Sequence, residues 1–408
     1  MSFFDSLLRA KDKIEAKIEE QLHIFQSDSS SHQEGGDGGP PPIPPRPAHL
    51  FPQYAQPGPP QQSFGGGGQY MNAVYYPSWA IYKDKTPGTL DVSSVTHVYY
   101  AFIGVNEDGS LRHFDEWADL NKDVDGEKGC LAALAKLKSE NPHIKTVLSV
   151  GGGTGSKEFP ALAASEDARR RFADEARQFC DRHSFDGIDI DWEHPQDEEQ
   201  GYHFLKLLEA CRETLPSPTY LLTTALPVGE WVLRHLDLAR VSHVIDYINL
   251  MAYDYTGAWT QSCGHQAQLH VPPSVHPELG HCGSKAIDYI LSRGFQARQL
   301  VLGVPNYARF FPRARGHGDR FEGAGEMEYC DIPDEWVERA YVDDRAVAAW
   351  HMDHDEKGFV SFDVPATVQM KASFVAGMGL GGLFYWTWTG DKQGPLSLVA
   401  AGRYALGS

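Results

Sequence analysis

From residue 71 onward, short runs rich in β-branched and aromatic residues alternate with longer segments whose apolar residues recur every three or four positions. The first pattern is typical of strands and the second of amphipathic helices. The expected strands are 72–76, 96–103, 144–150, 185–192, 220–226, 246–253, 299–305 and 381–386. The expected helices between them include 127–140, 167–183, 198–214, 284–293 and 366–377.

Strand-like runs interleaved with helices indicate an α/β fold in which helices cover a parallel sheet. Several of the runs are continuously apolar, as strands buried on both faces are. Eight strands is the number that closes a (β/α)8 TIM barrel, and a domain over 71–408 has a suitable length. The long gap between the seventh and eighth strands predicts a small, reduced insertion at about 310–360.

The N-terminal part has a different character. Residues 1–26 carry a helical apolar pattern over 3–25 with mixed charges, which favours a helix that docks on a partner or a core over one bound to lipid. Residues 27–70 are rich in Pro, Gly and Ser, which predicts a disordered linker. Within it, Pro41 to Arg46 fits the PxxPxR pattern of SH3-domain ligands, although a plain linker is the simpler interpretation.

Net charge, apolar windows and cysteine spacing limit the classes of partner and the compartment to expect. The formal net charge of −19 argues against nucleic acid or an anionic membrane as the main partner. No apolar window is long enough to span a membrane, and the first residues lack the apolar core of a secretory signal. The six cysteines are scattered, which disfavours zinc and fits a reducing compartment, although Cys263 and Cys282 could pair after export. We expect a cytoplasmic protein, with unconventional secretion as the alternative.

The stretch FDGIDIDWEHP, residues 185–195, alternates acids with large apolar side chains. In a strand, residues two apart share a face, so Asp189, Asp191 and Glu193 point one way. In a barrel they line the interior and approach the C-terminal mouth, where such enzymes carry out chemistry. Buried like charges share protons, which raises the pKa of the outermost acid and suits it to general acid catalysis. A divalent metal site or a solvated strand end would explain the alternation less well.

These acids match the DxxDxDxE motif. Here the sequence resembles glycoside hydrolase family 18, the chitinases, and most of all the fungal members of that family. Asp186 supplies the first position of the motif. Four further segments are similar to family motifs: SVGG (149–152), MAYD (251–254), GVPNYAR (303–309) and GGLFYW (381–386). The five motifs occur in order on the expected strands.

The resemblance implies substrate-assisted hydrolysis, an exception to the usual pair of enzyme carboxylates. Glu193 would protonate the glycosidic oxygen, and the substrate's own acetamido oxygen would attack the anomeric carbon to form an oxazolinium ion. Asp191 would orient the acetamido N–H, Asp189 would hold the proton of Asp191 at rest, and Tyr253 would donate to the acetamido oxygen. No metal or organic cofactor is implied.

Other residues have weaker assignments: the alternative is a surface salt bridge for Arg309 and packing for the apolar residues. Substrate contact is expected for Trp386, Met251, Asp254 and Arg309. For Tyr75, Phe102 and Trp231, substrate contact and packing are equally expected. Structural support is expected from Asp186, Ser149 and Gly151.

The sequence departs from the family pattern at two places: Gly153 replaces the usual Trp after SxGG, and His194 replaces the usual Tyr after the glutamate. The function implied is an endo-acting chitinase that cleaves β-1,4-N-acetylglucosamine linkages with retention. The alternatives are an endo-β-N-acetylglucosaminidase acting on N-glycans and a non-catalytic chitin-binding lectin. The presence of Glu193 argues against the lectin.

Overall fold

The computed structural model describes residues 70–271 and 275–407. The helix expected at 3–25, the linker up to residue 69 and the PxxPxR segment lie outside the described residues.

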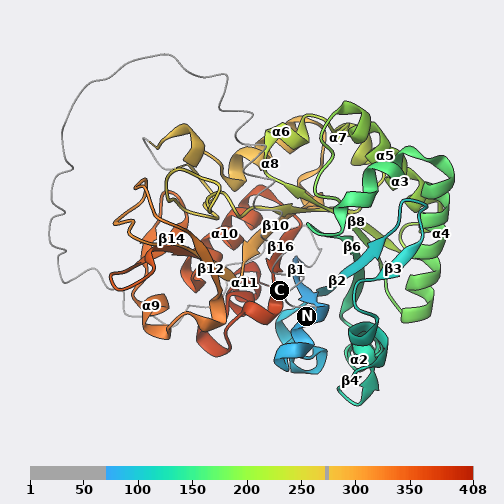
Figure 1. The fold of residues 1–408 in the computed structure, drawn as a ribbon, viewed down its shortest axis with the longest axis horizontal. Coiled ribbons are helices and arrows are strands. Elements are labelled where there is room, and N and C mark those ends of the chain that lie inside the picture. The colour runs from blue at the N-terminus through green and yellow to red at the C-terminus, as the bar shows by residue number, and fades with distance from the viewer. Residues whose placement is uncertain (1–69, 272–274, 408) are drawn as a thin grey trace. The chain divides into compact units, whose positions relative to one another are not determined.

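Eight parallel strands form a closed barrel, which confirms the fold expected from the sequence (Figure 1). Neighbours around the barrel are paired in chain order, and the first strand closes the ring because it pairs with both the second and the last. The strands are β1 (Met71–Pro77), β2 (His97–Val105), β6 (Lys145–Gly151), β7 (Gly187–Asp191), β8 (Leu221–Pro227), β9 (Tyr247–Met251), β10 (Leu300–Pro305) and β16 (Gly382–Trp386).

Helices cover the outside of this ring, because one face of each strand is apolar and needs a partner. Outward side chains such as Ile188 and Ile190 belong to the large core between the strands and the helices, while Tyr75 and Phe384 belong to a separate cluster inside the barrel. The helices are α2 (Gly129–Glu140), α3 (Phe159–Ala164), α4 (Glu166–His183), α5 (Glu198–Thr214), α6 (Glu230–Leu233), α7 (Leu238–Val241), α8 (Gly283–Ser292), α10 (Pro365–Met378) and α11 (Leu398–Leu406).

The insertion expected at about 310–360 lies between β10 and β16, and its strands run from Tyr307 to Phe362. It is a five-stranded antiparallel sheet in the order β12-β11-β15-β14-β13, and it begins directly after the barrel strand that precedes it. Its strands are short and partly exposed, so they carry a weak sequence pattern. The elements are β11 (Tyr307–Phe311), β12 (Gly325–Glu328), α9 (Asp334–Glu338), β13 (Tyr341–Asp343), β14 (Ala348–Asp353) and β15 (Gly358–Phe362).

Three minor strands complete the secondary structure. β3 (Leu111–His113) pairs antiparallel with β2, and β4 (Asp123–Val124) pairs with β5 (Glu127–Lys128).

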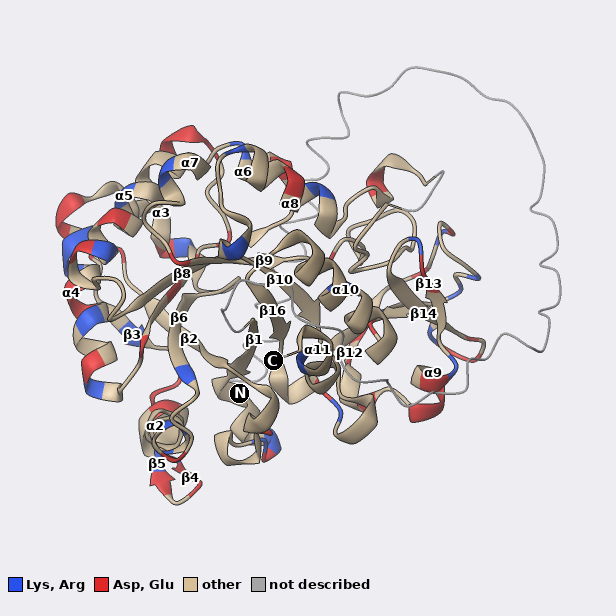
Figure 2. Cartoon of the chain, turned by 180° about the vertical axis from the view of Figure 1, so that it is seen from behind, with Lys and Arg blue, Asp and Glu red and all other residues tan. Residues whose placement is uncertain are grey.

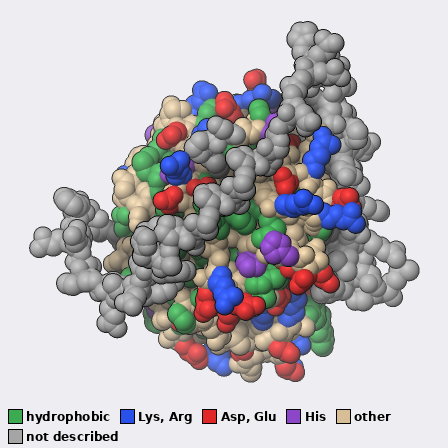
Figure 3. Space-filling model, turned by 90° about the vertical axis from the view of Figure 1, so that its left-hand side faces the viewer, with side chains coloured by type: hydrophobic (Ala, Val, Ile, Leu, Met, Phe, Trp, Pro, Cys, Tyr) green, Lys and Arg blue, Asp and Glu red, His purple; other side chains and the backbone are tan. Residues whose placement is uncertain are grey.

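Residues of both charges are interspersed on the outer helices, as α4 shows (Figure 2), and on the face drawn in Figure 3. No helix of the described segments is both long and apolar enough to cross a membrane. All six cysteines are free, so Cys263 and Cys282 are not paired in this structure.

Candidate active site

Two acids of β7, Asp189 and Asp191, and Glu193 just after it form one row that rises through the barrel. The β7 register places Asp189 level with Ser149 on β6 and Thr223 on β8, and it places Asp191 level with Gly151. Glu193 follows two residues after the strand and is half-buried at the C-terminal mouth. The sequence predicted this shared face because side chains alternate along a strand.

Asp189 is completely buried and surrounded by hydroxyl donors. Its two oxygens accept hydrogen bonds from Thr223 at 2.7 Å, from Ser149 at 2.8 Å and from Tyr75 at 2.9 Å. Burial raises the pKa of Asp189, and these three hydrogen bonds oppose that rise because they favour the charged form. Ser149 therefore supports the site by holding Asp189 in place.

Asp191 has the opposite environment. It is 3% exposed, and its Oδ1 has no hydrogen-bond partner within the described chain. Burial, then the negative charges of Glu193 and Asp189, raise its pKa well above the ordinary value. The resemblance assigned the resting proton to Asp189, but the donors around that residue favour Asp191 as the protonated member of the pair. A protonated Asp191 also leaves an oxygen free to meet a substrate N–H.

Glu193 is held by its backbone. Its N–H donates to Ser156 Oγ at 2.8 Å, and the Ser156 hydroxyl in turn donates to the carbonyl oxygen of Gly152 at 2.9 Å. Burial, followed by the negative charge of Asp254, raises the pKa of Glu193 to about 7. A carboxyl group with this pKa is partly protonated at neutral pH, as a general acid must be. Ser156 was missed by sequence reasoning, since a lone loop serine carries no signal.

Tyr253 follows β9 and lies among the same acids. Its ring contacts Phe384 and Tyr307, with ring centroids 6.1 and 6.2 Å away. Burial, then the negative charges of Asp191, Asp254 and Glu193, raise its pKa well above the ordinary value. Its hydroxyl therefore stays protonated and can donate a hydrogen bond. Met251, two residues earlier, packs against the cluster inside the barrel.

Asp254 and Arg309 form one unit. The Arg309 guanidinium donates to Asp254 Oδ1 from Nε at 2.9 Å and from Nη2 at 2.8 Å, and the Tyr307 hydroxyl donates to the same oxygen at 2.7 Å. Arg309 also pairs with Glu326 at 3.2 Å and lies 4.9 Å from the ring centre of Trp259. These contacts show that Arg309 positions Asp254, and its direct contact with substrate stays a prediction.

An aromatic group borders the mouth on the other side. Trp386 ends β16 and stacks on Phe102, with ring centroids 5.7 Å apart and planes 25° apart. Trp79, which is 37% exposed, contacts both rings from outside at 6.4 and 6.5 Å. The ring of Tyr75 is 5.5 Å from Trp386 but only 2% exposed. Tyr75 thus lies buried beneath this aromatic group, and Trp79 is an exposed neighbour that sequence reasoning missed.

The family model for glycosyl hydrolases family 18 matches residues 71–391. The chain belongs to this family. It is 35% identical to Chitinase 1 of Aphanocladium album, over 84% of this chain and 86% of that relative. It is 33% identical to Endochitinase 1 of Metarhizium robertsii, over 83% of this chain and 86% of the relative. The solved structure of the Ostrinia furnacalis Group IV chitinase is similar, with a TM-score of 0.76 and 26% identity over 84% of this chain and all of that one.

This family 18 glycoside hydrolase departs from the family pattern at Gly153 and His194, and both residues lie beside Glu193. His194 contacts the Trp231 ring edge-on, with centroids 5.5 Å apart, and burial lowers the pKa of His194 to about 4. His194 is therefore neutral at physiological pH. Trp231 is 54% exposed, so its ring is available to a ligand next to His194, the residue after Glu193.

Gly151 is a glycine for a steric reason. Its φ is +113°, and a Cβ built on it would lie 2.3 Å from the carbonyl oxygen of Asp191. A side chain here would push β6 away from β7. The structure thus agrees with a supporting role for Gly151 at the barrel mouth.

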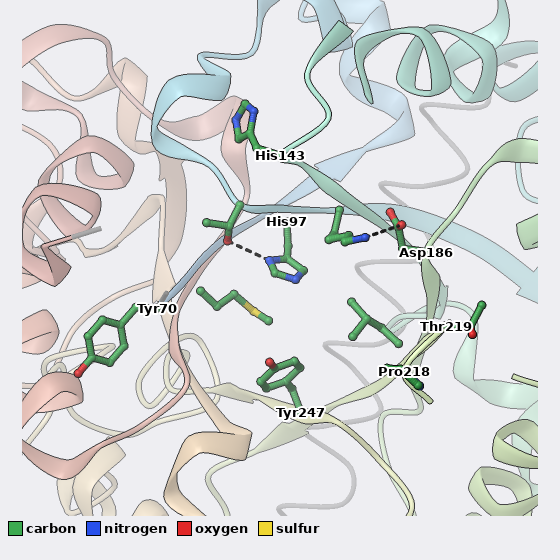
Figure 4. Close-up of a pocket in the computed structure, with 11 residues that line it drawn as sticks. Tyr70, His97, His143, Asp186, Pro218, Thr219 and Tyr247 are labelled. Carbon is green, nitrogen blue, oxygen red and sulfur yellow. Dashed lines mark hydrogen bonds and ion pairs between the residues drawn. The ribbon is translucent and has the colours of Figure 1, made fainter. Parts of the chain in front are cut away.

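Asp186 lies at the opposite end of the barrel. It accepts a hydrogen bond from the backbone N–H of Thr146 at 2.8 Å and pairs with Lys138 at 2.6 Å and Lys145 at 3.2 Å. A hollow of about 280 Å³ lies beside it among residues that begin the strands, including His97 and Tyr247 (Figure 4). Asp186 therefore anchors the start of β7, and this hollow is remote from the catalytic row.

Two polar strand residues were also missed. Thr223 holds Asp189, and Asn249 donates to the Tyr75 hydroxyl at 2.8 Å. Both stand on inward-facing positions of otherwise apolar strands. A polar residue at such a position is a signal that could have identified them, because buried polar groups are normally hydrogen-bonded.

Proposed function

We propose that this protein is a chitinase that hydrolyses β-1,4 linkages between N-acetylglucosamine residues. One observation carries the proposal. A half-buried Glu193 with a raised pKa stands directly above Asp191, whose free oxygen has no partner in the described structure. The names of the similar proteins, which include a chitinase and an endochitinase, support chitin as the substrate class.

The first step breaks the glycosidic bond. Glu193 donates its proton to the bridging oxygen, and the leaving sugar departs as an alcohol. The acetamido oxygen of the substrate forms a bond to the anomeric carbon in the same step, which gives a cyclic oxazolinium ion. Asp191 accepts a hydrogen bond from the acetamido N–H through its free oxygen, and the neighbouring Asp189 carboxylate stabilises the positive charge that develops. Tyr253 donates its hydroxyl hydrogen to the acetamido oxygen, which holds that oxygen on the face from which it attacks.

The second step restores the enzyme. Glu193, now ionised, removes a proton from water as the water attacks the anomeric carbon and opens the ring. Two inversions at that carbon give net retention of configuration. Asp189 keeps its negative charge through its three hydroxyl donors and so balances the charge that develops around Asp191. No step needs a metal ion or an organic cofactor.

The aromatic group of Trp386, Phe102 and Trp79 suits the C–H face of a sugar ring, because such faces are apolar. We assign this aromatic group to the sugar that carries the reacting acetamido group and to the sugar units beyond it, away from the leaving group. Trp231, on the far side of Glu193, is assigned to the leaving-group side.

Glu193→Gln tests this function. The amide has the same shape but no acidic proton, so we expect the rate on chitotetraose to fall by about 10²–10⁴-fold, the usual contribution of general acid catalysis. Binding of the tetramer, measured by calorimetry, should persist. The exposed Glu198→Gln on α5 is the matched control and should keep full activity.

A high-mannose glycopeptide assayed in parallel separates the two hydrolase alternatives. Cleavage of chitotetraose without cleavage of the glycopeptide is the expected result. Cleavage of the glycopeptide alone would assign the site to N-glycans. An unchanged rate in Glu193→Gln would remove the catalytic assignment altogether.

A further inference from the structure

One serine side chain joins the segment after β6 to the backbone around the catalytic glutamate. Ser156 begins the short turn η5 (Ser156–Glu158) and is 6% exposed. Its Oγ accepts a hydrogen bond from the backbone N–H of Glu193 at 2.8 Å. Its hydroxyl hydrogen lies within reach of two carbonyl oxygens, that of Gly152 at 2.9 Å and that of Asp191 at 3.2 Å. The hydroxyl group of Ser156 therefore contacts the backbone of both Asp191 and Glu193.

Glu193 depends on this contact because it lies outside the sheet. β7 ends at Asp191, so the ladder of strand hydrogen bonds stops before Glu193. Within the described part of the chain, the N–H of Glu193 is bonded to Ser156, and no hydrogen bond reaches its carboxyl group. The direction of that carboxyl group thus follows from how the Glu193 backbone is held.

The other end of the contact is rigid. The carbonyl oxygen of Asp191 also accepts the backbone N–H of Gly152 at 2.9 Å, and the N–H of Gly155 donates to the Gly152 carbonyl at 3.0 Å. The ends of β6 and β7 are therefore fixed to each other. Ser156 extends this fixed unit by two residues, from Asp191 to Glu193.

We propose that Ser156 is a positioning residue for the general acid. It sets the height and direction of Glu193 above Asp191, so that the carboxylic proton meets the bridging oxygen of the substrate. The inference rests on the proposed function. Ser156 contacts no reacting atom in the proposed mechanism and acts through the backbone of Glu193. Because proton transfer needs hydrogen-bond distance, a small displacement of Glu193 slows protonation more than it weakens binding.

The leaving group of the substrate distinguishes positioning from a purely structural role. A sugar alcohol leaves only when the bridging oxygen is protonated, whereas 2,4-dinitrophenolate is stable enough to leave without a proton. A residue that positions the acid should therefore matter for the first kind of leaving group and not for the second. A residue that only stabilises the fold should affect both substrates alike.

Ser156→Ala removes the hydroxyl group and tests the proposal. We expect kcat/KM for chitotetraose to fall about tenfold to a hundredfold, the usual effect of a misplaced catalytic group. For 2,4-dinitrophenyl chitobioside it should fall less than about threefold, because departure of that group needs no acid. The ratio kcat/KM reports the steps up to departure of the leaving group, so the later role of Glu193 as a base does not enter.

Ser165→Ala is the matched control. Ser165 Oγ accepts the backbone N–H of Ala168 at 3.3 Å at the start of α4, so this variant loses a hydrogen bond of the same kind away from the acids. It should melt at a lower temperature and keep wild-type kcat/KM on both substrates. If Ser156→Ala does not fold, as judged by thermal melting, Ser156→Cys takes its place, since a thiol is a weak acceptor. The same selective loss is expected of it.

An unchanged kcat/KM for chitotetraose in the Ser156 variant would overturn the inference, and so would equal falls on both substrates. Glu193→Gln separates this failure from failure of the function, because it should lose chitotetraose and keep the dinitrophenyl substrate. If the wild type hydrolyses neither substrate, the chitinase assignment is lost. If Glu193→Gln shows the selective loss and the Ser156 variant does not, only the role of Ser156 is lost.

Discussion

At the scale of single residues, three acids of one row, two on β7 and one just after it, have three different environments. Asp189 accepts three hydroxyl hydrogen bonds, Asp191 has a free oxygen and two acidic neighbours, and Glu193 lies at the rim. Burial raises the pKa of all three, but the hydrogen bonds restrain only that of Asp189. Similar side chains can therefore act as a fixed anion, an orienting group and a proton donor.

Asp254 influences the pH dependence of the rate. The active form of Glu193 is protonated, so the rate should fall as the pH rises through its pKa of about 7. The charge of Asp254 contributes to that raised pKa. Asp254→Asn removes the charge and leaves the Arg309 cation nearby, and both changes lower the pKa of Glu193. We expect the alkaline limb of the kcat profile to move toward lower pH.

The matched control for this measurement is Glu198→Gln, an exposed acid that does not influence Glu193. Its profile should coincide with that of the wild type. A limb that stays in place, or moves toward higher pH in Asp254→Asn, would contradict the assigned cause.

At the scale of elements, the eight barrel strands could be predicted within about two residues of their observed ends, because each combines an apolar run with flanking turn residues. The run expected at 96–103 is β2 at 97–105, for example. The position of the insertion was also predicted, but not the strands within it. Its sheet is partly exposed and its strands run for three to six residues, so periodicity gives little indication of it.

A buried ion pair joins the insertion to the barrel. Lys371 on α10 is 1% exposed and donates from Nζ to Asp363, 2% exposed and directly after β15, at 2.6 Å. Lys371→Met leaves the Asp363 carboxylate buried without its partner, so we expect the free energy of unfolding to fall by about 3–5 kcal/mol. Urea denaturation followed by circular dichroism measures this loss.

The double variant Lys371→Met/Asp363→Leu is the control for that result. With both charges removed, most of the lost stability should return, because well-packed apolar residues replace buried ion pairs at little cost. If the free energy of unfolding of Lys371→Met falls by less than about 1 kcal/mol, the pair is in contact with water, contrary to the burial that the structure indicates.

At the scale of the whole molecule, two distant segments meet where lysines of residues 83–85 contact a group of potential metal ligands, Glu328, Cys330 and Asp331. Lysines occupy this group already. Lys83 and Lys85 pair with Glu328 at 2.6 and 2.9 Å, and the Lys85 ammonium lies 3.2 Å from the Cys330 sulfur. A cation would have to displace both lysines, so the group is better explained as an ion-pair network.

Chelation tests this interpretation together with the metal-free mechanism. We expect hydrolysis of chitotetraose to change by less than about 20% after dialysis against EDTA, since every catalytic step uses protein groups or the substrate's acetamido group. Loss of activity that returns on addition of a divalent cation would contradict both.

The sequence by itself determined the barrel and the acidic row, because both follow from local periodicity: apolar runs make buried strands, and residues two apart share a face. It also identified Tyr253 and Trp386 through motifs tied to strand ends. Only the tertiary structure decided the partners of these residues. Three donors from separate strands set Asp189 apart from Asp191, Arg309 pairs with Asp254, and Gly153 faces Glu193. Such contacts join residues far apart in the chain, and no local pattern encodes them.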